Sequence, residues 1–359
     1  MAAPRKRKAR SAVPQTLVVA ASLRVLRFDP ETDKEPRWQR YEVELPEGST
    51  VLEALMHVQD HQDGSLTFRR SCRHAICGSC GMRINGCARL ACNTQLAVVA
   101  AEAQRCWAPG PEGAAPSGNR SAGEAAAAPA PISIEPLGNM PVVKDLVTDM
   151  TQFWAKLRGV QPWLQSLDAH PDPDHERPMS PETYGVLSRA LLCVECGCCF
   201  SDCCSVEASA EFVGPTALAK AFRYAFDTRD DQLHRRMFDL TNEHGLWECT
   251  RCYFCTQRCP KHLRVRELIT ALGGLAFEEG LRADAGARRA AGVRASVLAS
   301  GHLDEARMTL AAQGPAGALA RLPQAARAAV SGKLSLRPLE PVDKLEDVQA
   351  VARAVEDEA

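Results

Sequence analysis

The chain has 359 residues and a formal net charge of −1, which leaves room for two domains with additional tails. This near-neutral charge argues against a nucleic-acid-binding protein, because such proteins usually carry a strong excess of basic residues. No run of 18 apolar residues occurs, so the sequence predicts no membrane span of its own.

The first 45 residues predict a basic tail followed by two strands. Residues 1–19 contain the run PRKRKAR without the apolar core of a secretory signal, and we expect a flexible tail. SLRVLRF (22–28) and RYEVEL (40–45) alternate apolar and polar positions, which predicts strands. Thr50 and Glu53 then have capping-box spacing and predict a helix through about His61.

Strand, strand, helix and a cysteine-rich loop is the element order of a β-grasp ferredoxin. Residues 20–135 are therefore predicted to form an α+β domain. Residues 101–130 are rich in Ala, Gly and Pro without periodicity, and we expect a flexible insertion there.

The rest of the chain has helical patterns. Residues 136–280 are predicted to form an all-α domain, in which Ser180-Pro181 is typical of a helix start and residues 216–227 have helical apolar spacing. Residues 281–359 are rich in Ala and Arg and are predicted to form a helical C-terminal extension.

Sixteen cysteines are concentrated in three short segments. Five lie between Cys72 and Cys92, six between Cys193 and Cys204, and four between Cys249 and Cys259, while Cys106 stands alone. In a chain without a secretion signal, such clustering predicts metal ligands rather than disulfides.

The first segment has C-x4-C-x2-C spacing followed by a more distant cysteine, which is typical of a plant-type [2Fe–2S] site. The predicted ligands are Cys72, Cys77, Cys80 and Cys92. Gly78 and Gly81 allow the backbone to curl closely around a cluster. Cys87 is the alternative fourth ligand, but it follows an Asn-Gly turn signal. A four-cysteine zinc site fits less well, because zinc sites favour paired C-x2-C knuckles.

The other two segments each contain C-x2-C-x2-C-x3-C, the spacing of bacterial ferredoxins, in which the fourth cysteine of a run binds the other cluster. That rule assigns one cubane cluster to Cys193, Cys196, Cys199 and Cys259. It assigns the other to Cys203, Cys249, Cys252 and Cys255. Cys198 and Cys204 are out of phase and receive no role, and a pair of zinc sites is the alternative.

Several of these segments together resemble one family. RRSCRHAICGSCGMRING with LACNT, NMPVVKDLVTDM, CVECGCC and FVGPTALAKAFRYAFDTRD are similar to segments of the iron–sulfur subunits of succinate dehydrogenase and fumarate reductase. The resemblance extends in order from about Ser22 to Leu275.

The resemblance implies an electron-transfer subunit without catalytic residues, inactive toward succinate alone. A separate FAD-containing flavoprotein subunit would exchange electrons with succinate or fumarate. Electrons would pass through [2Fe–2S], [4Fe–4S] and a third cluster toward quinone. The subunit would lie peripherally on the cytoplasmic face of the inner membrane, held by a membrane anchor.

The chain departs from the family pattern in two places. The family's third cluster is usually [3Fe–4S], with a non-cysteine residue where Cys252 stands, so a second [4Fe–4S] cluster is favoured here over [3Fe–4S]. The family's quinone-contact positions hold Cys204, Glu207-Ala208 and Thr250 instead of the usual residues, and no standard quinone pocket is predicted.

The C-terminal tail resembles a second family. GHLDEARMTLAAQGPAGALARLPQAARAAVSGKLSL is similar to the tail of heterodisulfide-reductase C-type ferredoxins, which implies a cysteine-rich partner with CCG motifs. An ordinary helical appendage is the alternative. At the level of the whole chain, the alternatives are an electron-transfer adaptor for another dehydrogenase and a zinc-stabilised interaction protein without a redox role.

Overall fold

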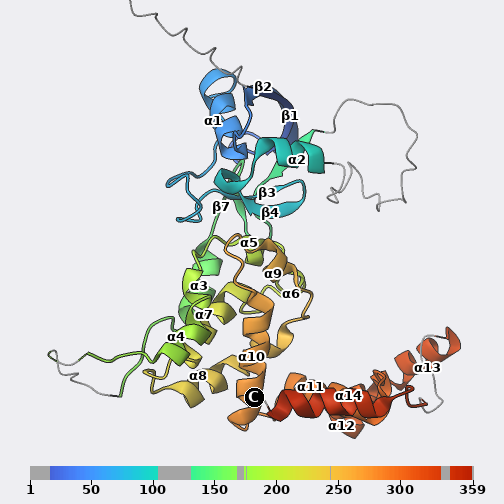
Figure 1. Cartoon of the computed structure of the whole chain (residues 1–359). Coiled ribbons are helices and arrows are strands. Elements are labelled where there is room, and N and C mark those ends of the chain that lie inside the picture. The colour runs from blue at the N-terminus through green and yellow to red at the C-terminus, as the bar shows by residue number, and fades with distance from the viewer. Residues whose placement is uncertain are drawn as a thin grey trace, which may run out of the picture. The chain divides into compact units, whose positions relative to one another are not determined.

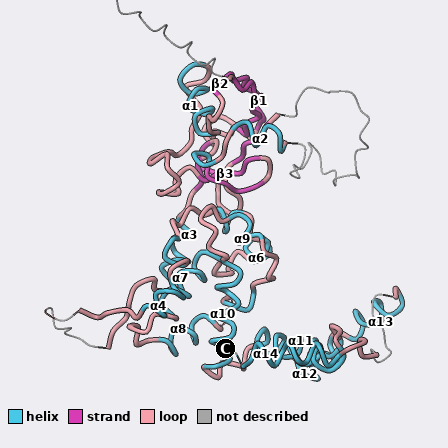
Figure 2. Tube along the Cα trace, viewed as in Figure 1, coloured by secondary structure: helices cyan, strands magenta, loops and turns pink. Residues whose placement is uncertain are grey.

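The computed structural model describes residues 17–103, 131–167, 174, 176–242, 244–332 and 340–357. The predicted tail 1–19 and insertion 101–130 lie outside the described residues, apart from 17–19 and 101–103. The chain divides into two compact units. The ferredoxin unit comprises the described residues up to Ala155 together with Leu192–Cys203 and Cys252–Arg264, and the helical unit comprises the remainder. Figures 1 and 2 show the named strands gathered in the ferredoxin unit.

A five-stranded sheet of order β2-β1-β5-β3-β4 forms the ferredoxin unit's framework. Its strands are β1 (Val18–Arg27), β2 (Arg37–Pro46), β3 (Gly81–Ile84), β4 (Cys87–Leu90) and β5 (Ile132–Glu135). β1 pairs antiparallel with β2 but parallel with β5, which gives a mixed sheet. Asn85 and Gly86 between β3 and β4 both have positive φ, as a two-residue hairpin turn of type I′ requires. A two-stranded ribbon of β6 (Val142–Lys144) and β7 (Val147–Thr148) follows, so the prediction of helices alone over residues 136–280 is wrong for this segment, whose strands pair with each other through backbone hydrogen bonds.

Helix α1 (Val51–His61) begins with the predicted capping box. Thr50 Oγ1 accepts a hydrogen bond from the Glu53 N–H at 3.2 Å, and Glu53 Oε2 accepts one from the Thr50 N–H at 2.7 Å. α1 buries one apolar face, and α2 (Leu96–Glu102) buries another. The fully buried side chains of this core include Leu23, Val25, Leu52, Leu55, Met82, Ile84, Leu96 and Ile134.

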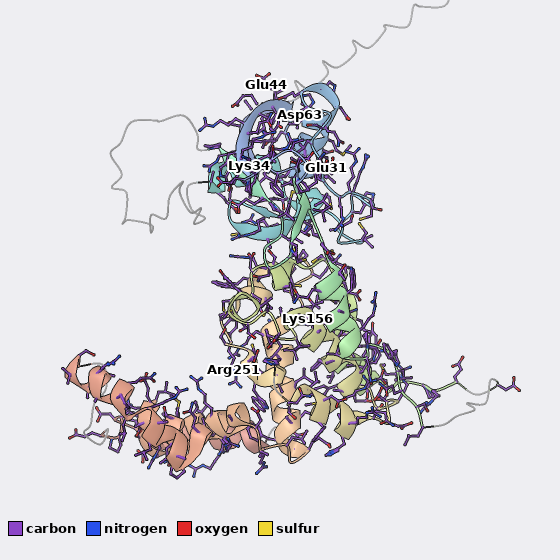
Figure 3. All side chains as sticks on the ribbon, turned by 180° about the vertical axis from the view of Figure 1, so that it is seen from behind. Glu31, Lys34, Glu44, Asp63, Lys156 and Arg251 are labelled. Carbon is purple, nitrogen blue, oxygen red and sulfur yellow. The ribbon has the colours of Figure 1, made fainter. Side chains whose placement is uncertain are left out.

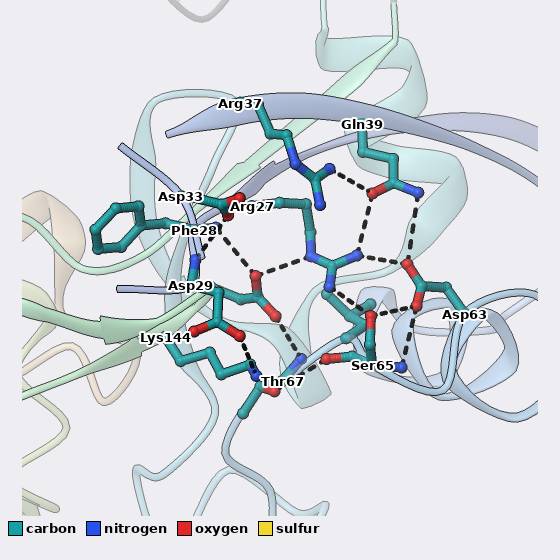
Figure 4. Close-up of polar contacts among 12 residues, drawn as sticks. Arg27, Phe28, Asp29, Asp33, Arg37, Gln39, Asp63, Ser65, Thr67 and Lys144 are labelled. Carbon is teal, nitrogen blue, oxygen red and sulfur yellow. Dashed lines mark hydrogen bonds and ion pairs between the residues drawn. The ribbon is translucent and has the colours of Figure 1, made fainter. Parts of the chain in front are cut away.

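A buried arginine joins the sheet to the segment that enters the cysteine-rich loop (Figure 4). Arg27 is 3% exposed, and its guanidinium bonds Asp145 at 2.9 Å and Asp63 at 2.5 Å. Asp145 also accepts hydrogen bonds from the N–H groups of Phe28 at 3.1 Å and Thr67 at 2.9 Å. Burial lowers the pKa of Arg27, but the hydrogen bonds that Arg27 donates to Asp145 and Asp63 outweigh burial and raise that pKa above its usual value. The network therefore holds the chain a few residues before Cys72.

The remaining elements are helical. The ferredoxin unit contains η1 (Ala91–Asn93), α5 (Cys198–Ser201) and α9 (Phe254–Arg258), and α3 (Thr151–Gly159) crosses the boundary between the units. The rest are η2 (Ala190–Leu192), η3 (Leu246–Glu248), α4 (Pro181–Leu187), α6 (Cys204–Ala208), α7 (Pro215–Ala225), α8 (Leu233–Leu240), α10 (Val265–Glu278), α11 (Ala285–Ser300), α12 (Glu305–Ala320), α13 (Leu322–Val330) and α14 (Leu345–Asp357).

Polar side chains and close helix contacts hold the helical unit together. Lys156, which is labelled in Figure 3, belongs to α3. Its Nζ donates to the carbonyl oxygens of Ala210 and Phe212. Trp247 stacks edge-on to Phe277 of α10, and the first turn of α11 packs against it. Ser180 caps α4, as its sequence predicted, by accepting the Thr183 N–H at 3.1 Å. The predicted fold class, an α+β ferredoxin domain followed by helical residues, is confirmed.

Candidate iron–sulfur centres

The loop that begins at Cys72 has an unusual backbone. Arg73, Ala75 and Gly78 all adopt left-handed φ, at 58°, 56° and 73°. Two of these residues carry side chains, so the conformation costs free energy that the surrounding structure must offset. Repeated reversal of the backbone turns successive N–H groups toward the inside of the loop, where they can meet negative charge.

Those N–H groups point at cysteine sulfurs. Cys72 Sγ accepts from the N–H groups of His74, Ile76 and Cys77 at 3.3–3.4 Å. Cys92 Sγ accepts from the Ala75 N–H at 3.2 Å. Hydrogen bonds of this kind stabilise thiolates, and thiolates are the form of cysteine that binds metal. The loop therefore fits a group that is held by several negatively charged sulfurs.

The thiols of this loop lie in contrasting surroundings. Burial raises the pKa of Cys77, but hydrogen bonds from the Ser79 side chain and the Cys72 N–H outweigh it and lower that pKa to about 6. Burial raises the pKa of Cys80 to about 12. A thiol with so high a pKa loses its proton at neutral pH only when a metal replaces it. Cys80 thus fits a buried ligand, while Cys77 fits a ligand at the exposed rim.

The structure brings Cys92, rather than Cys87, to Cys80 and to the N–H groups of the cysteine-rich loop. Besides its bond from Ala75, the Cys92 thiol hydrogen-bonds that of Cys80. Cys87 is 8% exposed, lies in β4 and interacts with the side chain of Arg89. This grouping fits the predicted ligand set for the [2Fe–2S] cluster, with Cys92 as its fourth member.

The two ferredoxin-type runs fold alike. In the first, Glu195 and Gly197 flank Cys196 with φ of 54° and 77°, and α5 follows. In the second, Arg251 and Tyr253 flank Cys252 with φ of 59° and 69°, and α9 follows. The equal spacing of cysteines therefore produces equal local geometry. In each run the third predicted ligand lies at the start of a short helix.

The first cubane set lies wholly in the ferredoxin unit. It comprises Cys193, Cys196, Cys199 and Cys259. A hydrogen bond with Cys198 is the main cause that lowers the pKa of Cys196 to about 7. Burial raises the pKa of Cys259, and the charge of Cys196 raises it further. The two runs thus come together here, as the crossed ligand pattern requires.

The third set is distributed over both units. Cys203, Cys252 and Cys255 belong to the ferredoxin unit, and Cys249 belongs to the helical unit. Cys203 and Cys255 are each 8% exposed, whereas Cys252 is exposed. Within the described ranges, no three His, Cys, Asp or Glu side chains are arranged to hold a single metal ion.

Asp202 is a site residue that the sequence motifs did not predict. Its Oδ2 atom accepts from Arg258 Nε at 2.7 Å and from the Ala88 N–H of β4 at 3.0 Å. Asp202 precedes the predicted ligand Cys203, and Arg258 precedes Cys259. One carboxylate therefore fastens both cysteine runs to the sheet. The only sequence signal was an acidic residue inside a cysteine run, which has no specific meaning by itself.

Two of the positions that departed from the family's quinone contacts, Cys204 and Thr250, form a small polar group with Ser205. Cys204 Sγ lies 3.2 Å from Thr250 Oγ1, and Ser205 Oγ accepts the Thr250 N–H at 3.2 Å. No helix among the described residues is both long and apolar enough to cross a membrane.

Comparisons with known proteins agree with this geometry. Residues 22–155 match the model of a 2Fe-2S iron-sulfur cluster binding domain, and residues 189–263 match that of a 4Fe-4S dicluster domain. The chain therefore carries [2Fe–2S] and [4Fe–4S] cofactors.

Two curated relatives and one solved structure extend the likeness beyond single domains. The fumarate reductase iron-sulfur subunit of Mycobacterium tuberculosis is 36% identical over 239 residues, which are 67% of this chain and 85% of the relative. A mitochondrial succinate dehydrogenase iron-sulfur subunit of Oryza sativa is 35% identical over 71% of this chain and 81% of the relative. A chain of the apo Mycobacterium smegmatis Sdh1 complex superposes with a TM-score of 0.53 at 27% identity, covering 73% of this chain and 98% of that one. This chain belongs to the family of iron–sulfur subunits of succinate dehydrogenase and fumarate reductase.

Proposed function

We propose that this chain conducts single electrons between an FAD-containing flavoprotein subunit and a membrane-side acceptor. Cys72, Cys77, Cys80 and Cys92 would hold the [2Fe–2S] cluster. Cys193, Cys196, Cys199 and Cys259 would hold the [4Fe–4S] cluster. Cys203, Cys249, Cys252 and Cys255 would hold the third. The clusters would supply the redox chemistry, and the chain's own residues would place them and exclude water.

One observation carries this proposal. Residues 192–203 and 252–264, which contain most of the cubane-type cysteines, belong to the same compact unit as the ferredoxin sheet. Asp202 ties these runs to β4 through Ala88 and Arg258. An electron relay needs successive carriers at fixed, short separations, and membership of one compact unit supports the first two ligand sets as such neighbours.

Anaerobic purification of the full chain tests whether it holds iron–sulfur clusters at all. We expect iron and acid-labile sulfide together with visible absorbance from the clusters. Zinc without sulfide would overturn the proposal and favour the zinc-stabilised interaction protein. Reconstitution with the flavoprotein subunit should then allow succinate to reduce the clusters. Clusters that dithionite reduces but succinate does not would favour an adaptor for another dehydrogenase.

For the third cluster, we propose [4Fe–4S] with Cys252 as the additional ligand. Cys252 lies in a run whose backbone repeats that of the first run, with Arg251 and Tyr253 in the same left-handed conformation as Glu195 and Gly197. This repeated local geometry supports a third ligand set of four thiolates, like that of the first run.

Electron paramagnetic resonance of the oxidised protein tests this cluster assignment. The unsubstituted chain should lack a [3Fe–4S] signal, and Cys252→Ser should produce one. Cys204→Ser is a matched control, because Cys204 contacts Thr250 and belongs to no predicted ligand set. A [3Fe–4S] signal in freshly oxidised, unsubstituted protein would contradict the assignment.

We further propose a peripheral position at a membrane, on its cytoplasmic face, through a membrane anchor or a CCG-type cysteine-rich subunit. Cys204 and Thr250, which contact each other, occupy two of the positions of the family's quinone contacts, which favours a protein acceptor with quinone reduced only indirectly. Co-expression of this chain with each candidate subunit tests the choice. The partner that co-purifies and is reduced through this chain identifies the acceptor.

A further inference from the structure

Two glycines of the [2Fe–2S] loop lie directly against a residue of the [4Fe–4S] ligand set. A Cβ atom added at Gly78 would lie 2.8 Å from Cys196 Cα and 2.9 Å from Cys196 Cβ. A Cβ added at Gly81 would lie 3.0 Å from the Cys196 carbonyl oxygen and 3.3 Å from Leu137 Cδ1. Non-bonded carbon atoms normally stay about 3.5–4.0 Å apart. No side chain, not even a methyl group, fits between Gly78 and Cys196 without a shift of the backbone.

The cysteine run cannot easily move away from these glycines, because other residues of the unit hold it as well. A Cβ at Gly197 would lie 3.2 Å from Met140 Cε and 3.4 Å from Leu137 Cδ1. Asn139 Nδ2 donates to the carbonyl oxygens of Phe200 and Cys203 at 2.9 and 3.1 Å. Close-packed and hydrogen-bonded surroundings resist displacement. The gap between the two ligand loops is therefore set by the absence of side chains in the first loop.

We propose that Gly78, with Gly81, sets the separation between the first and second clusters, and that the contact of Gly78 with Cys196 is the crossing point for electrons. This inference rests on the proposed function. When the clusters are bound, one electron leaves the reduced [2Fe–2S] centre and reduces the [4Fe–4S] centre, with no bond made or broken. Electron tunnelling weakens steeply with distance, so the width of this contact controls the rate. Gly78 and Gly81 are positioning residues, since neither binds iron.

Three single substitutions distinguish the effect of a steric contact with Cys196 from the effect of backbone strain at a positive φ. Gly78→Ala introduces both, because Gly78 has φ of 73° and a close neighbour. Gly81→Ala introduces only the contact, because Gly81 is not among the residues with positive φ. Gly48→Ala introduces only strain, because Gly48 has φ of 90° with nothing within 4 Å of its added Cβ. All three glycines belong to the ferredoxin unit.

The experiment uses the full chain, purified without oxygen and fully reduced. Spin relaxation of the [2Fe–2S] signal, enhanced by the nearby reduced [4Fe–4S] cluster, reports their separation without any turnover. We expect this enhancement to fall in Gly81→Ala and further in Gly78→Ala, with Gly48→Ala unchanged. Electron equilibration between the clusters after rapid partial reduction should slow several-fold in the same order.

Two results would overturn the inference. One is a Gly81→Ala variant that holds both clusters and has the same relaxation enhancement and the same rate of electron equilibration as the unsubstituted chain. If Gly78→Ala loses its cluster, the result for Gly81→Ala alone decides. The other is an equal loss in Gly48→Ala, which would assign the effect to backbone strain. Failure of the proposed function looks different, because the unsubstituted chain itself would then lack one cluster or show no magnetic interaction between the two.

Discussion

Replacing Asp145 with alanine removes a carboxylate from the interior of the ferredoxin unit. Asp145 is 2% exposed and accepts hydrogen bonds from Arg27 Nε, the Phe28 N–H and the Thr67 N–H. The substitution leaves two backbone N–H groups without this acceptor. Each buried N–H group that loses its acceptor costs about 1–3 kcal/mol of folding free energy. Breaking a buried ion pair costs about 3–5 kcal/mol in total, and these effects overlap. Because Arg27 keeps Asp63 as a partner, we expect a loss at the lower end of that range.

Urea unfolding under anaerobic conditions measures this loss. Visible circular dichroism of the [2Fe–2S] cluster follows the ferredoxin unit separately from the helical unit. The free energy of unfolding falls by about 1–3 kcal/mol per molar urea. A loss of about 3 kcal/mol in that free energy therefore lowers the urea concentration at the unfolding midpoint by at least about 1 M. The cluster should also be released more easily, because the bond to Thr67 holds the chain that leads to Cys72.

The neighbouring residue provides the matched control. Lys144 forms an ion pair with Asp29 at 2.6 Å, but its side chain is 39% exposed. Solvent screens exposed pairs, so Lys144→Ala should move the midpoint far less than Asp145→Ala. Equal and small shifts in the two variants would refute the reasoning that the buried Arg27–Asp145 pair secures the loop.

Three further predictions concern the first domain. Cys92→Ser should abolish the [2Fe–2S] signal in electron paramagnetic resonance, whereas Cys87→Ser should retain it; the reverse result would exchange the two assignments. The pKa of Asp63 lies below its usual value, mainly through the hydrogen bond from Ser65, so its ionised form stabilises the fold above about pH 4 and loses this effect as the pH falls further. The difference in unfolding free energy between the unsubstituted chain and Asp63→Asn should therefore shrink as the pH falls through about 4, and a constant difference would argue against it. Thr50→Ala should destabilise the domain by about 0.5–2 kcal/mol in urea unfolding, because it removes the capping box of α1, and an unchanged midpoint would show that the cap contributes nothing.

The candidate site was predictable where the signal is local. Cysteine spacing indicated the three ligand sets, because a cluster needs thiolates at short, fixed intervals along a tightly curled loop. The left-handed residues of each loop follow from the same requirement, although Arg73, Ala75 and Tyr253 have side chains that give no hint of positive φ. The ligand assignments themselves stay predictions until spectroscopy tests them.

What the sequence by itself determined was the type of those elements that carry a strong local signal. Alternating polarity indicated the first two strands, Thr50 with Glu53 indicated α1, and Ser180-Pro181 indicated α4. Each of these signals depends on residues within a few positions of one another. Local hydrogen bonds and side-chain periodicity are sufficient to produce them.

Only the tertiary structure decided which distant segments meet. No local pattern joins Arg27 to Asp145, Asp202 to Ala88, or Gly78 to Cys196, because each pair lies far apart in the chain. These contacts arise when burial brings separate elements together, and each then depends on a complementary charge or on the absence of a side chain. The spacing of cysteines thus predicted the kinds of centres in this protein, while packing determined how closely the first two predicted ligand sets approach each other.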